Sequence, residues 1–164
     1  MYIKPCKSII DFSELSFMLK EYLEELHAIN EKVEVRNTVQ IEREYFHNSQ
    51  NTLFYLLLDE DYDDRIAGFA IIGTKSNCHS KCDLYIEEFY IDPFYRSKGQ
   101  GIKFINSLLD LFNPKRICFY ILKNNNRATV FWEKALINWK DISLSIKDEL
   151  PTLEHLTWKV YESA

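Results

Sequence analysis

The residues best suited to chemistry lie in a glycine loop that follows an acidic strand. Residues 85–101 read Tyr-Ile-Glu-Glu-Phe-Tyr-Ile-Asp-Pro-Phe-Tyr-Arg-Ser-Lys-Gly-Gln-Gly, and two of the four glycines of the chain, Gly99 and Gly101, fall in this stretch. N–H groups in the first turn of a helix lack intrahelical acceptors and lie at the positive end of the helix dipole. Glycine lets such amides approach a phosphate, and Arg96 and Lys98 add positive charge. The segment therefore predicts an anion-binding loop at a helix start.

Two nucleotide-binding patterns do not fit this loop. A dinucleotide-binding fingerprint needs a third glycine and an acidic residue about 20 positions further on. Phe104 stands where that glycine belongs, and the acidic position is empty. A nucleoside-triphosphate loop ends in Gly-Lys-Ser or Gly-Lys-Thr, which the chain does not contain here.

A third pattern fits better. The string Arg-x-x-Gly-x-Gly at residues 96–101, after a strand and an Asp-Pro turn, resembles the acetyl-CoA motif of the GNAT superfamily of N-acetyltransferases. Residues 125–134, Asn-x-x-Ala-x-x-Phe-Trp-Glu-Lys, resemble the second signature of that family. The specific matches lie between about Tyr85 and Lys134, and the order of elements is similar over the whole chain.

This resemblance implies acetyl-CoA as a co-substrate and no metal. The pantetheine arm would lie in a wedge between two splayed strands, paired with backbone groups of Phe89 and Ile91 and bonded by Asn125 from the opposite strand. Trp132 would also contact the cofactor. The pyrophosphate would be held by the backbone amides of Arg96, Ser97, Lys98, Gly99, Gln100, Gly101 and Ile102.

The resemblance also implies a direct attack of an amine on the acetyl group. Residues 85–91 are similar to the corresponding strand of spermidine/spermine acetyltransferases, in which the first acidic residue deprotonates the amine through water. An ammonium group with a pKa near ~10.4 must lose a proton before it can attack. Glu87 is the preferred general base and Glu88 the second candidate. We expect the two to point to opposite faces of the strand, and the N–H of Ile91 to stabilise the oxyanion.

Two departures from the family pattern leave the function open. Trp132 stands where many relatives have a tyrosine that protonates the departing thiolate, and residues 136–137 are Leu-Ile where Gly-Phe is common. A thiol with a pKa near ~8.5 is a fair leaving group without that acid. The alternatives are acetylation of a protein or peptide and an acyl-CoA-binding module that has lost transfer. For the acceptor, a small cationic amine is favoured by the acidic early segment, which holds Glu21, Glu24, Glu25, Glu31, Glu34, Glu42 and Glu44.

The elements that must position these residues follow from hydrophobic periodicity. We expect strands at residues 2–4, 53–58, 66–73, 84–91, 117–122, 142–146 and 156–161, and helices at 11–29, 39–46, 102–112 and 128–136. The run at 117–122 is apolar throughout, as in a strand that is parallel and buried on both faces. The predicted class is α/β with a mixed sheet, in a single domain spanning residues 1–164. The resemblance to the GNAT superfamily implies in addition that the sheet is mostly antiparallel, with one splayed parallel pair and about four flanking helices.

Composition limits the partners. With 164 residues, 46% of them hydrophobic, the chain suits one folded domain. Its net charge of −5 argues against nucleic acid or an anionic membrane as the main partner. The start of the chain shows no secretory signal, so we expect a cytoplasmic protein, and the family makes a homodimer possible. The four cysteines are expected as free thiols, and the pair Cys78 and Cys82 lacks the second pair that a zinc site needs.

Overall fold

A seven-stranded mixed sheet forms the frame of the protein. The computed structural model describes residues 1–7, 9–41, 52–73, 82–143, 145–146 and 153–163. Within these, the strand order is β1-β2-β3-β4-β5-β7-β6. Every neighbouring pair is antiparallel except β4 and β5, which are parallel. The predicted mixed sheet is therefore confirmed. The strands are β1 (Tyr2–Pro5), β2 (Thr52–Asp59), β3 (Arg65–Gly73), β4 (Leu84–Ile91), β5 (Arg116–Leu122), β6 (Trp139–Asp141) and β7 (Leu156–Ser163).

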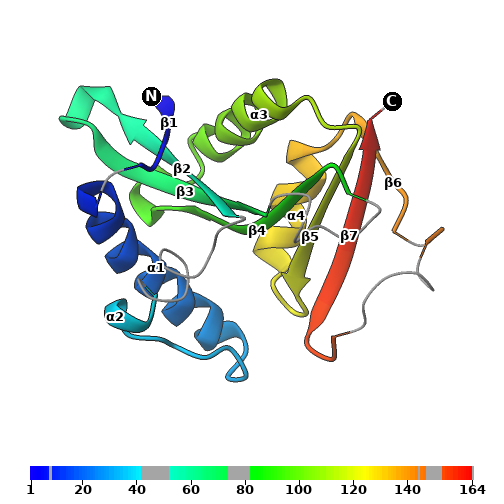
Figure 1. Cartoon of the computed structure of the whole chain (residues 1–164). Helices are drawn as coiled ribbons and strands as arrows, with labels where there is room; N and C mark the ends of the chain where they lie inside the picture. The colour runs from blue at the N-terminus through cyan, green and yellow to red at the C-terminus, as the bar shows by residue number, and fades with distance from the viewer. Residues whose placement is uncertain (8, 42–51, 74–81, 144, 147–152, 164) are drawn as a thin grey trace.

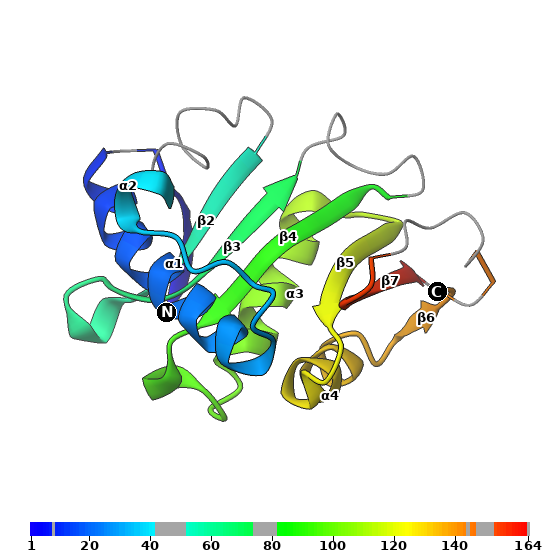
Figure 2. The ribbon, with the colours of Figure 1, turned by 90° about the horizontal axis from the view of Figure 1, so that it is seen from below.

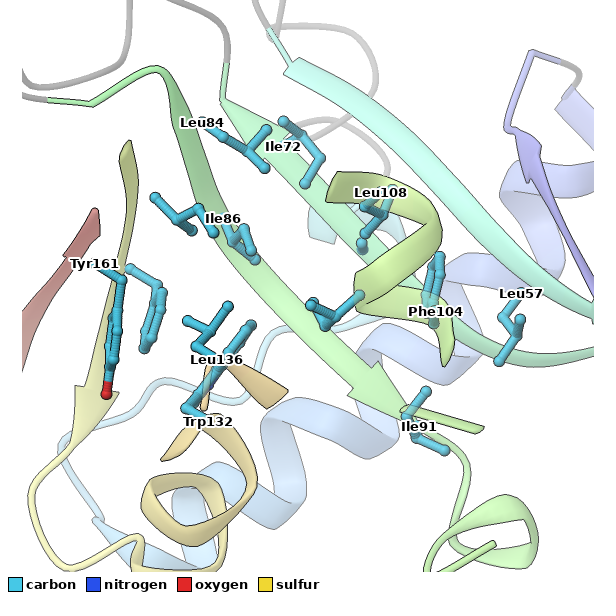
Figure 3. Packing of buried hydrophobic residues seen from close by; sticks show 14 of the residues in the cluster. Leu57, Ile72, Leu84, Ile86, Ile91, Phe104, Leu108, Trp132, Leu136 and Tyr161 are labelled. Atoms are coloured by element: carbon cyan, nitrogen blue, oxygen red, sulfur yellow. The ribbon is translucent and has the colours of Figure 1, made fainter. Parts of the chain in front are cut away.

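Helices cover both faces of this sheet (Figure 1). They are α1 (Ile9–Ile29), α2 (Thr38–Ile41), α3 (Gln100–Phe112) and α4 (Asn126–Ala135). Helix α1 packs Leu15 and Leu19 against one face, in a cluster that includes Ile71. Helices α3 and α4 pack Phe104 and Trp132 against the other face, in the second cluster (Figure 3). The helix expected at 39–46 is seen at its start, and its remainder lies outside the described residues.

The parallel pair β4 and β5 is hydrogen-bonded over only part of its length. The register joins Leu84 to Ile117, Tyr85 to Cys118 and Ile86 to Phe119, and then stops. On its other side β4 stays paired with β3 as far as Ile91. Beyond Ile86 the two parallel strands diverge toward α4 (Figure 2). The predicted splay is thus present, and it leaves one edge of the second half of β4 without a strand.

The unsplayed end of this pair is fastened by polar and covalent contacts. The Asp83 N–H donates to the Arg116 carbonyl at 3.0 Å, and the Asp83 carboxylate accepts from the Lys115 and Arg116 N–H groups at 3.0 Å each. A disulfide joins Cys82 to Cys118 across the same point.

The expectation of four free thiols was therefore wrong for two of them. It rested on the argument that a domain of this size needs no disulfide for stability. That argument does not predict which cysteines lie next to each other in the fold. Parallel pairing brings Cys118 of β5 beside the start of β4, and the Cα atoms of Cys82 and Cys118 lie 5.8 Å apart, within the range that a disulfide requires. Cys78 lies outside the described residues. Among the residues that the structure describes, no group of three or more His, Cys, Asp or Glu side chains could hold a metal ion.

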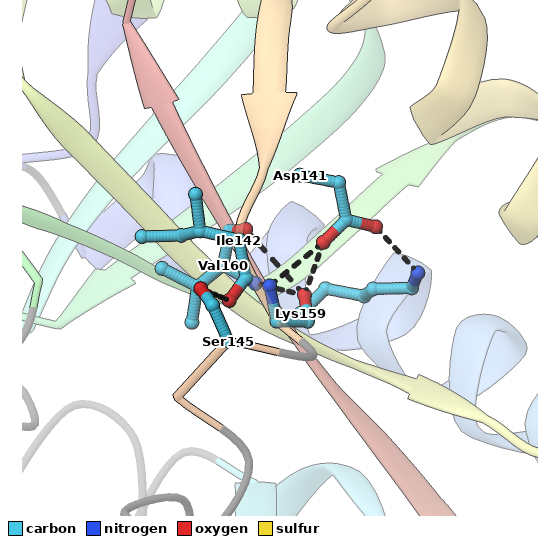
Figure 4. Close-up of polar contacts among 6 residues, drawn as sticks. Asp141, Ile142, Ser145, Lys159 and Val160 are labelled. Carbon is cyan, nitrogen blue, oxygen red and sulfur yellow. Dashed lines mark hydrogen bonds and ion pairs between the residues drawn. The ribbon is translucent and has the colours of Figure 1, made fainter.

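The strand expected at 142–146 was also wrong. Strand β6 ends at Asp141, whose carboxylate accepts from the Ser143 N–H at 2.9 Å and from the Lys159 ammonium at 2.8 Å. The Ser145 hydroxyl donates to the Ile142 carbonyl at 2.7 Å (Figure 4). Short polar side chains that bond to nearby backbone compete with a strand ladder, so the chain turns here. None of the helices in the described part of the chain is long and apolar enough to cross a membrane.

Candidate functional site

A cavity of about 540 Å³ lies at the open end of the splayed strands. Its walls come from α1, the end of β4, the glycine loop, the start of α3, and α4. Nine of the twelve residues predicted for the site line it: Phe89, Ile91, Arg96, Ser97, Gly99, Gly101, Ile102, Asn125 and Trp132. Lys98 and Gln100 line a smaller cavity of about 330 Å³ on the other side of the loop. Glu87 lines neither cavity.

The backbone of β4 presents hydrogen-bonding groups to the larger cavity. The Asp92 N–H donates to the Ala67 carbonyl of β3 at 3.0 Å. Because bonding alternates along an antiparallel ladder, the N–H and C=O of Phe89 and Ile91 point away from β3. They point toward the edge from which β5 has departed. The Ile91 carbonyl agrees with this direction, since it accepts from the Arg96 side chain.

The glycine loop turns sharply before α3. Ser97 and Gly99 have φ values of 61° and 76°, both in the left-handed region, and Gly99 is the N-cap residue of α3. A Cβ atom placed on Gly99 would meet nothing within 4 Å, so the glycine is required by its backbone conformation. Among the described residues no acceptor takes the N–H groups of Gln100, Gly101 or Ile102. These three groups can receive an anion.

The structure shows two further features of the predicted anion cradle, of which only the first departs from the prediction. The N–H of Arg96 donates to the Pro93 carbonyl at 3.3 Å, so this amide is already used. Gly101 has a packing role, because a Cβ atom there would lie 2.9 Å from the Phe131 ring and 3.3 Å from the Ile91 side chain. Its lack of a side chain brings α3 close to α4 and β4.

The side chains of the two loop cations contact protein groups. The Arg96 guanidinium pairs with Glu25 of α1 at 2.9 Å, and the Lys98 ammonium lies 4.2 Å from the centre of the Phe94 ring. Two further basic residues, Arg127 and Lys134 of α4, line the cavity together with Arg96. Sequence reasoning missed them, although their positions beside Asn125 and Trp132 in the second signature were a usable signal.

Aromatic side chains form the floor of the cavity. Trp132 is buried and stacks on Phe119 of β5, with ring centres 4.1 Å apart. Phe89 of β4 stacks on Phe131 of α4, with ring centres 5.3 Å apart. These rings fill the space between the diverging strands, as Figure 3 shows for Trp132. The indole offers no proton of useful acidity, so this wall supplies shape and not acid catalysis.

Asn125 has a structural contact as well as a place in the cavity. Its side-chain oxygen accepts from the Ala128 N–H at 3.0 Å, which caps the start of α4. The side-chain nitrogen is the group left to face a ligand. The residue predicted to bond a cofactor therefore also fixes the helix that carries Arg127 and Trp132.

The two adjacent carboxylates of β4 lie on the same face of the sheet, against the prediction. Ile71 pairs with Glu88 and Ile72 pairs with Ile86, so Glu87 is an extra residue in β4 and forms a bulge. A Cβ atom on Gly73 would lie 2.7 Å from the Glu87 Oε1, which places this side chain on the α1 face. Glu88 lies on that face too and accepts from the Tyr22 hydroxyl of α1 at 2.6 Å. Strand alternation fails at a bulge, which the sequence did not reveal.

The two carboxylates have different surroundings. Burial raises the pKa of the Glu87 carboxyl above its usual value. Glu88 instead accepts a hydrogen bond from the Tyr22 hydroxyl of α1. A carboxyl group with a raised pKa is suited to take up a proton near neutral pH.

The residues present fit an elongated anionic ligand such as acetyl-CoA. Unbonded N–H groups at the start of α3 suit a pyrophosphate, and the unpaired edge of β4 suits an amide-containing arm. Arg127 and Lys134 supply positive charge, and Phe89, Phe131 and Trp132 supply an apolar wall. On the α1 side the cavity is lined by Tyr22 and Glu25.

Comparison with known proteins agrees with this geometry. The family model described as "Acetyltransferase (GNAT) family" matches residues 16–136. A probable spermine N(1)-acetyltransferase from Bacillus subtilis subsp. natto is 28% identical in an alignment of 82 positions that covers 44% of this chain and 53% of that protein. The chain thus matches about half the length of this curated relative.

Solved structures share the fold over nearly the whole chain. An acetyltransferase from Thermus thermophilus superposes with a TM-score of 0.68 at 12% identity, covering 98% of this chain and 96% of the other. The PaiA N-acetyltransferase from Thermoplasma acidophilum, solved with coenzyme A, gives a TM-score of 0.64 at 16% identity and covers 99% of each chain. At such identities the likeness concerns the fold.

Proposed function

The chain belongs to the GNAT family of acetyltransferases, and we propose that it transfers the acetyl group of acetyl-CoA to the primary amine of a small cationic molecule. The main support is that the gap between β4 and β5 and the unbonded amides at the start of α3 border the same cavity. Phosphate-binding and arm-binding groups thereby share a single space. The proposal includes backbone contacts from Phe89, Ile91 and the loop amides Ser97 to Ile102, and a side-chain contact from Asn125.

The proposed general base is Glu87. It lies on the α1 face of β4, the side from which an acceptor would reach the cavity, and burial raises the pKa of its carboxyl group. It does not line the cavity, so the proton of the ammonium group would reach it through water. The bulge that turns Glu87 to this face is the structural feature that supports the assignment.

The proposed oxyanion donor is the N–H of Ile91, which ladder alternation directs into the wedge. Such a donor typically contributes about 3–4 kcal/mol to stabilisation of the transition state. No tyrosine stands at the position of Trp132, so the thiolate would leave without a general acid from this residue. A thiol with a pKa of about 8.5 allows this.

The acceptor class rests on two supports. The relative from Bacillus subtilis is named a probable spermine N(1)-acetyltransferase, and spermine is a polycation. Glu25 lines the cavity on the α1 side. The pKa of Tyr90 is raised mainly by burial, and the negative charges of Glu25 and Glu21 raise it further. Negative charge on this side suits an ammonium group. Dimerisation and a cytoplasmic location stay predictions.

The test begins with a calorimetric titration of acetyl-CoA, with NADH as the control ligand. Saturable binding of acetyl-CoA alone supports the cofactor site, and absence of binding by folded protein contradicts it. Thiol release is then followed with a panel of amines that includes spermine, small monoamines and a lysine peptide. Release with the peptide alone would favour a protein acetyltransferase, and binding without release from any amine would favour the acyl-CoA-binding module that Trp132 allows.

A further inference from the structure

Arg96 makes a set of contacts that turn it away from the anion cradle. Its Nε donates to the Ile91 carbonyl at 2.5 Å, and its terminal nitrogen pairs with the Glu25 Oε1 at 2.9 Å. The guanidinium carbon lies 4.9 Å from the centre of the Tyr90 ring. The Tyr90 hydroxyl donates to the same Glu25 oxygen at 3.2 Å. Four residues from α1, β4 and the glycine loop thus form one closed cluster, and all four line the cavity.

This cluster occupies groups that both substrates would need. The Ile91 carbonyl is one of the wedge-facing groups of β4, and Arg96 covers it. Glu25 is the carboxylate of α1 that faces the acceptor side of the cavity, and Arg96 neutralises it. A guanidinium group binds phosphate oxygens in a bidentate manner, so a pyrophosphate at the neighbouring loop competes with Glu25 for the same cation.

We propose that Glu25 is a positioning residue that holds Arg96 against the Ile91 carbonyl, and that acetyl-CoA binding transfers Arg96 from Glu25 to the pyrophosphate. The inference rests on the proposed function. Its consequence is an order of binding, because departure of Arg96 uncovers the Ile91 carbonyl and leaves Glu25 as an unneutralised carboxylate on the acceptor side. The Tyr90 hydroxyl keeps Glu25 in place after Arg96 has moved.

The proposal predicts that removal of a negative charge strengthens the binding of acetyl-CoA. In Glu25→Gln, Arg96 has no ion pair with residue 25, so no ion pair must break before Arg96 contacts the pyrophosphate. The Arg96 and Glu25 side chains are 19% and 39% exposed, and an ion pair of this kind contributes up to about 1 kcal/mol. Acetyl-CoA should therefore bind about threefold to fivefold more tightly than to wild type in calorimetry at low salt, and this gain should shrink at high salt.

Glu24→Gln is the matched control. Glu24 lies on the same helix and contacts Lys20 at 3.6 Å, so its substitution changes net charge equally without touching Arg96. Tighter binding in Glu25→Gln but not in Glu24→Gln supports the proposal. Equal gains in both would assign the effect to net charge, and unchanged or weaker binding in Glu25→Gln would assign Glu25 a merely structural role. Either result overturns the proposal.

A double substitution gives the second criterion. Arg96→Gln should weaken acetyl-CoA binding, and Glu25→Gln should add no gain in that background, because the two residues act as a pair. A full gain in the double variant would contradict the inference. Thermal unfolding of each variant checks folding, and Glu25→Ala serves if Glu25→Gln proves unfolded. Wild-type protein that binds no acetyl-CoA would instead contradict the proposed function, so the two failures are distinguishable.

Discussion

The two halves of β4 belong to one continuous strand, but their surroundings differ. From Leu84 to Ile86 the strand pairs with β5, and Tyr85 and Ile86 also pair with β3, beside a disulfide and the bonds of Asp83. From Glu87 to Ile91 it keeps only β3, and its other edge faces a cavity. The closed half, Leu84–Ile86, therefore holds the molecule together, and the open half, Glu87–Ile91, offers polar backbone groups to a ligand.

The difference shows how a fold can leave part of a sheet unpaired at a tolerable cost. A buried N–H or C=O without a partner is costly, so an open edge inside a domain persists where the rest of the strand is firmly held. The closed half of β4 provides this support. Substitutions in the closed half should accordingly change stability, and those in the open half should change binding and turnover.

The largest effect is expected from Phe119→Ala in β5, beside the closed half of β4. Phe119 is 1% exposed, pairs with Ile86 at the last parallel position, and stacks on Trp132 and Tyr161. Loss of such a buried ring costs about 3–5 kcal/mol. Urea unfolding should show this loss, whereas Phe89→Ala in the open half, where the ring is only half-buried, should cost less. A larger loss for Phe89→Ala would contradict the division of the strand.

The sequence predicted most of this frame because periodicity encodes which face of each element is buried. Strand β4 has the predicted bounds, and the parallel pairing of β5 followed from its apolar run. The strand expected at 142–146 failed because the bonds of Asp141 and Ser145 with nearby backbone end β6 early. Local polar competition of this kind leaves no trace in a hydrophobic pattern.

The site was predictable in position but not in orientation. Spacing placed the glycine loop and Asn125 beside one cavity. It could not place the Glu87 bulge, which depends on the register with β3, nor the ion pair between Arg96 and Glu25, which are 71 residues apart in the chain. Side-chain direction at these points is decided by tertiary contacts that no local pattern contains.

The next effect concerns the disulfide of the closed half. A cross-link between residues 36 positions apart stabilises a fold by about 3–4 kcal/mol in the chain-entropy account. Thiol reductant, or Cys82→Ser, should therefore lower the unfolding midpoint, and Cys6→Ser is the control that leaves the bridge intact. Acetyl-CoA affinity of the folded protein should change little, because the bonds of Asp83 still fasten this end. If the reduced protein or Cys82→Ser lost affinity for acetyl-CoA but not stability, the closed half would serve binding, and the distinction between the two halves would be wrong.

In the open half, Glu87→Gln should lower kcat by about 100-fold, the lower end of the range for general base catalysis. Activity of the wild type requires the deprotonated carboxylate, so it should fall as the pH drops through the raised pKa of Glu87, and the variant should lose this limb. Glu88→Gln is the comparison variant. A normal pH profile in Glu87→Gln, or an equal loss in Glu88→Gln, would remove Glu87 as the base.

The same substitution should affect stability in the opposite direction. Because burial raises the pKa of Glu87 in the folded state, the folded state favours its protonated form. The stability linked to this group is present at acidic pH and is lost as the pH rises through the folded-state pKa. Glu87→Gln should thus be slightly more stable than wild type at neutral pH and equal to it in acid, by thermal unfolding at both pH values.

The last prediction separates the two glycines of the loop. At Gly99 a Cβ atom meets no neighbour, so Gly99→Val should cost only the strain of a positive φ, about 1–2 kcal/mol, and act on the loop amides. At Gly101 even a methyl group meets Phe131 and Ile91, so Gly101→Ala should disturb the packing of α3 on α4. Calorimetry with acetyl-CoA should give about tenfold weaker binding for folded Gly99→Val. Unchanged affinity there would mean that the amides after Gly99 do not hold the pyrophosphate, and that the open half of β4 binds its ligand by the wedge alone.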